Sequence, residues 1–351
     1  MTYEYYPTSG GVETRVYHLA SELASRHEVV VYTRRSIERV KDRFNHEVFE
    51  VDYSKRRGIR GADFVRKIRS DIHKRRFDVL NIEQLGTGAL LAKTKGSKMS
   101  IITVHGRDLF DASWLLSILY SRILRRENVR VVCVSRFMKK AFLERFHIHD
   151  EKVSVVPHGV DTVLFRPVKP KKRNHFLFVG RFVPDKDPLC CVKAFKILKE
   201  RYPFDEASLT MIGGGPQFSA TEDLVKSYGL TDDVKLIGDV SNMGLPGYYS
   251  EASATICPRL AGMVLLESLA CGTPVIAGNI DMAPEIITHE CGFLAPASNP
   301  SVFAGIMHDI FCSRDENDLK GLSLSARAQA EKYAWPIIAK KLEAIFDVMP
   351  S

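Results

Sequence analysis

The feature that most constrains this chain is a regular alternation of short apolar runs with segments of helical periodicity. The segment 12–24 places its apolar residues on one helical face, and short β-branched runs typical of buried parallel strands follow it. This order of helices and strands predicts a doubly wound parallel sheet of the α/β class. The predicted strands of this first series are 28–33, 78–82, 100–104, 130–134 and 153–156.

The alternation breaks at 157–170, where three prolines lead into a basic run at 169–173, and then it resumes. This composition indicates a linker between two domains. The second series opens with a strand at 175–179 and a helix at 189–199, with Asp187 as its expected N-cap and Pro188 as its first residue. Two α/β halves predict a ligand-binding cleft between the carboxyl ends of their sheets. The remaining predicted elements are strands 208–212, 234–237, 253–256 and 274–277, and helices 300–311, 319–332 and 335–348.

Composition narrows the function classes. The 351 residues are 45% hydrophobic and 26% charged, which is typical of a soluble chain of about two domains. No apolar run approaches the roughly 18 residues of a membrane span, and the first 11 residues lack a signal-peptide layout. Seven cysteines, two of them adjacent at Cys190 and Cys191, indicate reduced thiols and a cytosolic location.

The net charge of +8 is concentrated in the segment 34–76, which holds 15 Lys and Arg against 7 Asp and Glu. Two interpretations stay open: a basic face for an anionic membrane or acidic acceptor, or solvated helix faces and loops. Nucleic acid is disfavoured because the segment lacks interleaved aromatic residues and a recognisable binding module. A predicted helix at 111–126 either packs in the core or lies on a membrane surface.

The loop after the predicted strand 175–179 carries Gly180, Arg181 and Lys186. Arginine through its planar fork and lysine as a point charge can together clamp a diphosphate; two solvated surface cations are the alternative. Asp185 and Asp187 form an Asp-x-Asp pair, but Asp187 is better used as a helix cap, so the pair does not indicate a metal site.

Glycines stand at other predicted strand and helix ends. Gly10 and Gly11 precede the first helix, and Gly213 follows the strand 208–212, so that backbone amides there could approach a phosphate. Plain turns explain these glycines equally well.

Two further residues carry chemistry at predicted element ends. A helix opening at 263–266 offers amides and a positive dipole, and Glu267 near its start could accept hydrogen bonds from ribose hydroxyls or be an ordinary helix-start glutamate. His105 ends a predicted strand beside a glycine, where it either positions or deprotonates a hydroxyl or serves a structural role.

Several motifs occur together and in one order: 9–13, 103–106, 134–137, 156–161 with Phe165 and Pro167, 179–181 with Lys186, 213–216, 237–238, 265–276 and 333–335. With this set the chain resembles the retaining nucleotide-sugar glycosyltransferases of the GT-B fold, specifically glycosyltransferase family 4. The resemblance covers essentially the whole chain. Each motif is modest, and the ordered set is highly specific.

The resemblance implies a GT-B architecture of two Rossmann-like domains that face a central cleft. The acceptor-side domain would comprise 1–165, with the helix 336–351 packing back on it, and the nucleotide-sugar-binding domain would comprise 166–335. The family implies metal-independent, retaining transfer of a sugar from a nucleotide-diphosphate sugar to a hydroxyl, with no other cofactor. The acceptor hydroxyl would enter on the face that the diphosphate leaves.

The family also implies roles for the matching residues. His105, Arg181 and Lys186 would be catalytic: the two cations would hold the donor diphosphate, and His105 would sit over the transferred sugar. Glu267 would bind the ribose hydroxyls. The implied donor-binding set comprises Gly10, Gly11, Gly180, Gly213, Ile237, Val264, Leu265 and Glu267.

Three positions depart from the family pattern. Arg259 stands eight positions before Glu267, where the family usually carries a glutamate that helps to grip the donor sugar. This puts sugar specificity and turnover in question, or suits an anionic donor sugar. His158 stands where asparagine is usual. Only a short segment precedes Gly10, so that either the true start lies upstream or the first sheet lacks most of a central strand.

Alternatives remain at this point. One is a catalytically impaired nucleotide-sugar-binding protein of the same fold, and another is a GT-B sugar-nucleotide epimerase. For the transferase, the expected partners are the nucleotide-sugar donor, a glycan or lipid-linked acceptor and an anionic membrane surface, with no nucleic acid. The expected location is the cytoplasm, with the inner membrane surface as the site of a lipid-linked acceptor.

Overall fold

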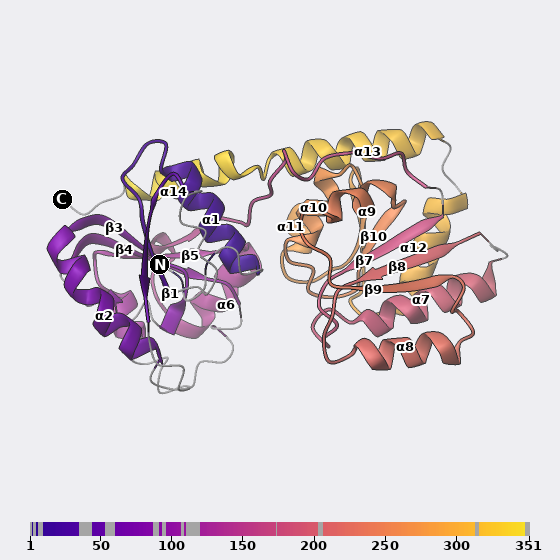
Figure 1. Ribbon diagram of the computed structural model, residues 1–351, viewed down its shortest axis with the longest axis horizontal. Helices are drawn as coiled ribbons and strands as arrows, with labels where there is room; N and C mark the ends of the chain where they lie inside the picture. Colours follow the sequence, from indigo (N-terminus) through magenta and orange to yellow (C-terminus); the bar gives the residue numbers. More distant parts are fainter. Residues whose placement is uncertain are drawn as a thin grey trace. The chain divides into compact units, whose positions relative to one another are not determined.

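The computed structural model describes residues 2, 5, 10–34, 44–52, 60–86, 91–92, 96–106, 109, 120–172, 174–202, 206–312 and 316–347. The chain divides into two compact units (Figure 1). Unit 1 comprises 1–158 together with 335–351, and unit 2 comprises 159–334. Each unit is described by itself below.

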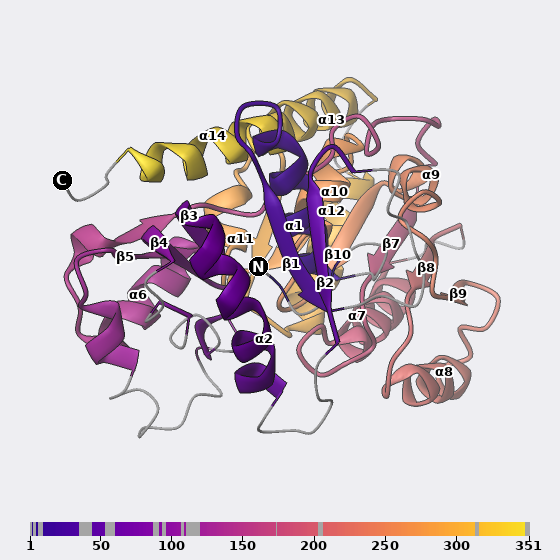
Figure 2. The ribbon, with the colours of Figure 1, turned by 60° about the vertical axis from the view of Figure 1, so that its left-hand side comes forward.

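Unit 1 contains parallel strands in two sheets within the described ranges. One sheet has the order β3 (Phe77–Ile82), β4 (Ser97–Val104), β5 (Val129–Cys133) and β6 (Val153–Val155). The other pairs β1 (Val30–Arg34) with β2 (Glu47–Val51), which run side by side in Figure 2. The sequence predicted one sheet here. In the segment before Gly10, the amide of Thr2 donates to the carbonyl of Tyr32 at 3.1 Å.

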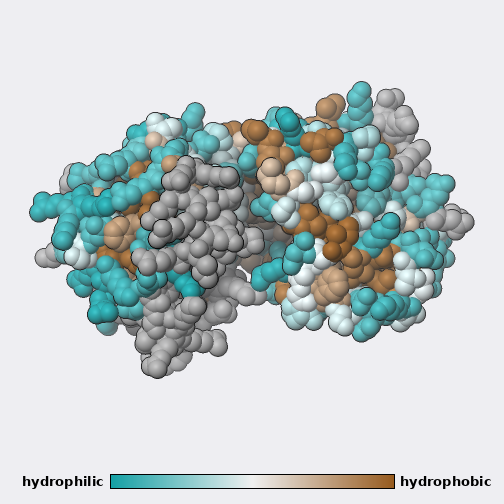
Figure 3. Space-filling model, viewed as in Figure 1, coloured by the Kyte–Doolittle hydropathy of each residue, from teal (hydrophilic) through white to brown (hydrophobic). Residues whose placement is uncertain are grey.

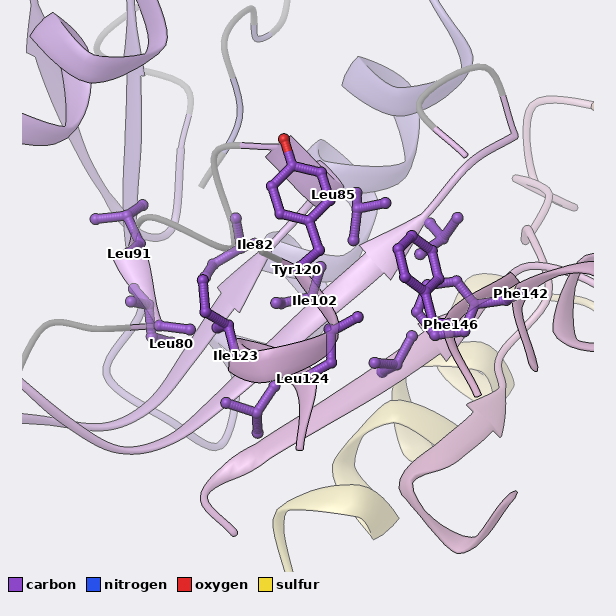
Figure 4. Packing of buried hydrophobic residues seen from close by; sticks show 14 of the residues in the cluster. Leu80, Ile82, Leu85, Leu91, Ile102, Tyr120, Ile123, Leu124, Phe142 and Phe146 are labelled. Atoms are coloured by element: carbon purple, nitrogen blue, oxygen red, sulfur yellow. The ribbon is translucent and has the colours of Figure 1, made fainter. Parts of the chain in front are cut away.

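The core of unit 1 is built from alternate strand residues and one face of each covering helix. Helix α2 (Arg60–Arg75) buries Phe64, Ile68 and Ile72, which recur every fourth residue and therefore share one face. Helix α6 (Arg136–Phe146) buries Phe142 and Phe146 in the same cluster. Figure 4 shows labelled side chains of β3, β4 and α6 gathered in this cluster.

Unit 1 also joins the two ends of the chain. Helix α1 (Gly11–Leu23) packs against α14 (Trp335–Phe346), where the rings of His18 and Trp335 stack with centroids 5.1 Å apart. Beyond the end of α1, the guanidinium of Arg26 donates to both carboxylate oxygens of Glu343 at 2.9 and 3.0 Å. Helix α14 begins at Trp335, which is the predicted start of the last helix.

Unit 2 is a six-stranded parallel sheet with the order β12-β11-β10-β7-β8-β9. Its strands are β7 (His175–Val179), β8 (Ser208–Ile212), β9 (Val234–Gly238), β10 (Ala254–Cys257), β11 (Val275–Gly278) and β12 (Gly292–Ala295). Strand β7 comes first in the chain yet lies between β10 and β8, so the strand order reverses direction beside it. Ligands bind α/β sheets at the carboxyl ends of the strands beside such a reversal.

Two separate hydrophobic cores cover the two faces of this sheet. Leu177 packs into one core, whereas its neighbours Phe176 and Phe178 pack into the other, because successive strand residues point to opposite faces. Figure 1 shows α7 and α8 on one side of the sheet and α10 on the other. The helices of unit 2 are α7 (Pro188–Arg201), α8 (Phe218–Ser227), α9 (Leu245–Glu251), α10 (Val264–Ala270), α11 (Ala283–Ile286), α12 (Pro300–Cys312) and α13 (Glu316–Glu331).

The observed elements confirm the predicted α/β class, and the ends of the predicted strands differ from the observed ones by at most three residues. Asp187 caps α7 as predicted, and its side chain accepts a hydrogen bond from the amide of Cys190. Strands β2 and β12 and helices α2, α6, α8, α9 and α11 were not predicted. The predicted helix at 111–126 falls mostly outside the described residues, as do Ser9 and the segment before it except Thr2 and Tyr5. Within the described ranges, no helix is long and apolar enough to cross a membrane.

Candidate functional site

The carboxyl ends of β7, β8 and β9 meet at glycines. The amide of Gly213 donates to the carbonyl of Gly238 at 2.7 Å, and the amide of Gly180 donates to that of Ile212 at 3.0 Å. A Cβ at Gly213, whose φ is +130°, would overlap the carbonyl oxygen of Gly180. Only glycine therefore allows this close approach of the two backbones, which forms the floor of the candidate site.

Lys186 reaches from the loop after β7 to the loop after β10. Its Nζ donates to the carbonyl of Leu260 at 2.6 Å, and the amide of Leu260 donates back to the carbonyl of Asp185 at 3.1 Å. The two loops lie at the point where the strand order reverses, so Lys186 is fixed at the expected ligand position. Burial lowers the pKa of Lys186, and the neighbouring charge of Arg181 acts in the same direction.

Glu267 lies in α10 with its carboxyl group buried, 8% exposed. The hydroxyl of Tyr249, in α9, donates to Oε2 of Glu267 at 2.8 Å. Burial raises the pKa of Glu267 to about 7, although the hydrogen bond from Tyr249 and the positive charge of Lys186 both lower it. A buried carboxyl close to half-ionised at neutral pH is typical of a functional site.

Other predicted residues of unit 2 surround this group. Arg181 is exposed, close enough to Lys186 for the two charges to interact. Ile237 of β9 is a large apolar side chain that is 42% exposed, which leaves a face for an aromatic or apolar ligand. Arg259 is exposed in the loop between β10 and α10. Val264 and Leu265 form the first turn of α10, whose leading amides lack intrahelical partners.

A second polar cluster lies in unit 1, around the carboxyl ends of β3 and β4. Glu83 is 1% exposed, and its Oε2 lies 2.7 Å from Nε2 of His105 and 3.6 Å from Nε of Arg15. The side-chain amide of Asn81 donates to its Oε1 at 2.9 Å. Although burial raises the pKa of Glu83, the hydrogen bond from His105 and the charge of Arg15 outweigh it, and the pKa falls to about 2.

Two histidines flank this buried carboxylate. The rings of His105 and His158 lie with centroids 5.6 Å apart, and the Nδ1 atom of each is buried without a hydrogen-bond partner within the described part of the chain. Burial lowers the pKa of His158 well below its usual value, and the charge of Arg15 adds to that effect. These effects favour the neutral form of His158, and His105 contacts the carboxylate through Nε2 while its Nδ1 stays unpaired within the described ranges.

The predicted residues thus fall into two groups. Arg181, Lys186 and Glu267 come together in unit 2 with the glycines 180 and 213, whereas His105 lies in unit 1, as do Gly10 and Gly11. Gly10 is extended at the N-cap of α1 and Gly11 is its first residue. Within the described ranges, no three His, Cys, Asp or Glu side chains are grouped so that they could hold a metal ion.

The sequence reasoning missed Arg15, Glu83 and Tyr249. Arg15 interrupts the apolar face of α1 and is fully buried. A cation on the apolar face of a predicted helix could therefore have indicated a buried functional residue. Glu83 directly follows β3, and His105 directly follows the neighbouring strand β4. The parallel pairing of the two predicted strands could therefore have indicated that the two side chains lie at the same end of the sheet. Tyr249 lies on a short helix whose sequence shows no comparable signal.

Two solved structures that superpose on this chain show its fold. A glycosyltransferase from Rickettsia africae is 20% identical and superposes with a TM-score of 0.83 over 99% of this chain and 97% of its own. An Anabaena protein crystallised with UDP and glucose is 17% identical, with a TM-score of 0.80 over 98% of both chains. The protein accordingly has the GT-B fold of two Rossmann-like domains, as predicted.

Family models then identify the group within that fold. The model of glycosyltransferase family 4 matches residues 9–164, and the model of the glycosyl transferases group 1 matches residues 161–321. Together they span most of the chain. The chain therefore belongs to the group 1 glycosyltransferases, with an N-terminal half of the family 4 type.

Three relatives give the range of similarity. A D-inositol 3-phosphate glycosyltransferase from Thermobispora bispora is 28% identical over 64% of this chain, and the match spans 58% of that relative's length. A GDP-mannose-dependent alpha-(1-6)-phosphatidylinositol monomannoside mannosyltransferase from Mycobacterium tuberculosis is 28% identical over 72% of this chain and 70% of its own. A human phosphatidylinositol N-acetylglucosaminyltransferase is 25% identical over 98% of this chain and 74% of its own.

Proposed function

We propose that this protein transfers a sugar from a nucleotide-diphosphate sugar to a hydroxyl acceptor. The observation that carries the proposal is the position of Lys186, fixed on the carbonyl of Leu260 and within electrostatic reach of the buried carboxyl of Glu267, at the reversal of strand order in unit 2. A fixed cation beside a carboxyl group suits a ligand that carries both a diphosphate and a ribose. The names of the family 4 and group 1 models support the same activity.

Each site residue has a role in this proposal. Arg181 and Lys186 bind the diphosphate and neutralise its charge as it leaves, and Glu267 accepts hydrogen bonds from the ribose. Glycines let the phosphates approach the backbone, the first amides of α10 face them, and Ile237 contacts the base. His105 lies over the transferred sugar. The remaining donor-binding residues are Gly10, Gly11, Gly180, Gly213, Val264 and Leu265.

The proposed reaction is retaining and does not use a metal. As the sugar–phosphate bond breaks, the anomeric carbon gains oxocarbenium character and the electron pair passes to the diphosphate. The acceptor hydroxyl attacks from the same face and gives its proton to the leaving diphosphate. Arg181 and Lys186 supply the positive charge that stabilises this leaving group. Loss of one such preorganised donor costs about 2.7–4 kcal/mol of barrier at comparable sites.

We further propose that the acceptor is lipid-linked and is met at an anionic, cytoplasmic membrane surface. Two of the relatives above are named for phosphatidylinositol substrates. In unit 1 the side chains of Arg69 and Lys74 are exposed on α2 and, among the described residues, have no ion-pair partner. Clusters of such cations attract anionic lipid surfaces. In Figure 3 the described surface at the lower left, over α2, is largely hydrophilic.

The test is a panel of UDP- and GDP-sugars, incubated with phosphatidylinositol-type and glycan acceptors, with product and released nucleotide measured by mass spectrometry. Lys186→Ala should lower turnover by at least about 100-fold, by analogy with the loss of a preorganised charge donor. Lys193→Ala, which removes an exposed lysine of α7 with no ion pair in the described structure, is the matched control. Equal loss in both variants, or full activity in Lys186→Ala, would contradict the proposal.

A second candidate is a nucleotide-sugar-binding protein without turnover. The observation that favours it is the exposed Arg259 in the β10–α10 loop, where the resembled family has an acidic residue. Binding of a nucleotide sugar without product on every donor and acceptor of the panel would support this candidate. Conversion of UDP-N-acetylglucosamine in the absence of any acceptor would instead identify an epimerase.

A further inference from the structure

The carboxylate of Glu267 is held from one side by a neighbouring helix. Tyr249 of α9 is fully buried, and its hydroxyl donates to Oε2 of Glu267 at 2.8 Å. Within the described residues, Oε1 of Glu267 makes no hydrogen bond. One oxygen of the carboxylate is thus satisfied inside the protein, and the other is left for an external donor.

The position of Tyr249 does not depend on Glu267. Its backbone carbonyl accepts a hydrogen bond from Oγ1 of Thr273 at 2.6 Å, and that hydroxyl in turn accepts from Nζ of Lys171 at 2.6 Å. The ring of Phe165 packs edge-on against the phenol ring, with centroids 6.1 Å apart. Tyr249 is therefore fixed by α9, by the turn after α10 and by an aromatic contact before it meets the carboxylate.

A buried carboxylate with no internal donor would rotate or take up a proton, and either change weakens its use as an acceptor. The phenol opposes both changes because it donates one hydrogen bond and stays protonated: burial and the nearby charge of Glu267 raise the pKa of Tyr249 well above its usual value. Lys186, whose charge reaches the same carboxyl, further favours the ionised form.

We infer that Tyr249 is a positioning residue that holds Glu267 so that Oε1 accepts a hydrogen bond from a ribose hydroxyl, making the site select ribonucleotides over deoxyribonucleotides. The inference rests on the proposed function, since it takes Glu267 as the residue that binds the ribose of the donor. It adds that selection for ribose depends on a residue that does not touch the ligand.

The test measures dissociation constants by calorimetry for UDP, GDP and their 2′-deoxy and 3′-deoxy counterparts. The unmodified protein should prefer at least one ribonucleotide over its deoxy form by about tenfold or more, the size expected for a hydrogen bond to a charged group. In Tyr249→Phe this preference should fall to within about threefold, because the carboxylate is no longer held. Binding of the deoxynucleotides should change little.

The matched control is Tyr248→Phe, which removes the same hydroxyl from the adjacent, partly buried tyrosine of α9. It should keep the preference for ribose. Should Tyr249→Phe fail to fold, 3-fluorotyrosine at position 249 preserves the shape and strengthens the donor, and the preference should then increase.

The outcomes separate this inference from the proposed function. If the unmodified protein binds no nucleotide, the proposed function fails, and the inference with it. If it binds ribonucleotides and Tyr249→Phe keeps the full preference, the positioning role is wrong while the proposed function stands. Equal weakening of ribo- and deoxynucleotides in Tyr249→Phe would assign Tyr249 a merely structural role and overturn the inference in the same way.

Discussion

Glu267 is a residue of the candidate site whose charge changes within the physiological pH range. Its pKa is raised to about 7, above the usual value of a glutamate, so the ionised fraction rises as the pH rises through 7. The ionised form is the better acceptor for a ribose hydroxyl. We therefore expect the affinity for a nucleotide-diphosphate sugar to increase from pH 6 to pH 8.

This dependence can be measured by calorimetry with an intact UDP- or GDP-sugar, whose diphosphate diester does not itself titrate in that range. Lys186 and Tyr249 are the groups that interact most directly with Glu267: burial lowers the pKa of Lys186 and raises that of Tyr249 well above its usual value. Lys171, which reaches Tyr249 through Thr273, has its pKa lowered by burial to about 8, so the comparison with a variant of Glu267 itself is needed. Glu267→Gln should bind more weakly and with no such pH dependence. A flat profile in the unmodified protein would contradict the prediction.

Gly213 lies where the backbones after β7 and β8 touch. Substitution with alanine would force its Cβ into the carbonyl of Gly180 and would strain a φ of +130°, so we expect Gly213→Ala to lower the melting temperature. Gly321→Ala is the matched control: this glycine is exposed inside α13 with open space around it. Alanine there should stabilise by about 0.5–1 kcal/mol. Equal effects in differential scanning calorimetry would refute the steric argument.

Among single residues, the sequence predicted those charged site residues that follow a glycine after a predicted strand. Arg181 directly follows Gly180, whereas Lys186 and Glu267 stand five or six positions after a glycine. In the structure the charge of Lys186 interacts with both Arg181 and Glu267. Arg15, Glu83 and Tyr249 were missed because each acts through a buried neighbour far away in the chain. Burial of a polar side chain is decided by tertiary packing, which one sequence does not display.

At the scale of elements, helix α2 accounts for part of the basic segment 34–76. Residues 35–43 and 53–59 of that segment lie outside the described residues. On α2, Asp63 pairs with Arg66 at 3.1 Å and Asp71 with Arg75 at 3.0 Å. The basic segment was interpreted either as a face that binds an anionic membrane or acidic acceptor, or as ordinary solvated helix faces and loops. Both interpretations predict exposed cations, so only a binding measurement distinguishes them.

We expect the double variant Arg69→Glu and Lys74→Glu to bind vesicles containing anionic lipid at least about 30-fold more weakly, since each cation near such a surface contributes about 1 kcal/mol. The measurement is vesicle co-sedimentation at low salt. Lys193→Glu with Arg201→Glu, two exposed positions of α7 in unit 2, gives the same change in net charge and is the control. Equal loss in both variants would show that net charge, and not this helix, drives binding.

Elements with strong local signals were predicted well. Strand β7 and strand β8 begin and end as predicted, because each is a short apolar run bounded by polar or glycine residues. Helix α2 was missed because charged residues dominate its sequence, and only Phe64, Ile68 and Ile72 mark its buried face. Strand β2 was missed because its five residues include two glutamates and show neither a continuous apolar run nor a strict alternation.

At the scale of the whole molecule, the α/β class and the GT-B fold followed from two series of alternating strands and helices together with ordered motifs. The division of the described strands of unit 1 into two sheets could not be predicted, because sheet order depends on long-range contacts. The membership of α14 in unit 1 likewise depends on a long-range contact, the packing of α14 against α1.

Unit 1 therefore depends on a helix that follows unit 2 in the chain. Leu342 of α14 is fully buried, and truncating such a side chain costs about 2–5 kcal/mol. We expect Leu342→Ala to speed amide hydrogen exchange in α1 and the β1–β6 strands while leaving β7–β12 unchanged, because the helix belongs to unit 1 and packs against α1. Ile337→Ala, at a position 41% exposed on the same helix, should alter neither unit measurably. Uniform acceleration across both units in mass-spectrometric exchange would mean that the two units unfold as one, and that the discontinuous unit has no stability of its own.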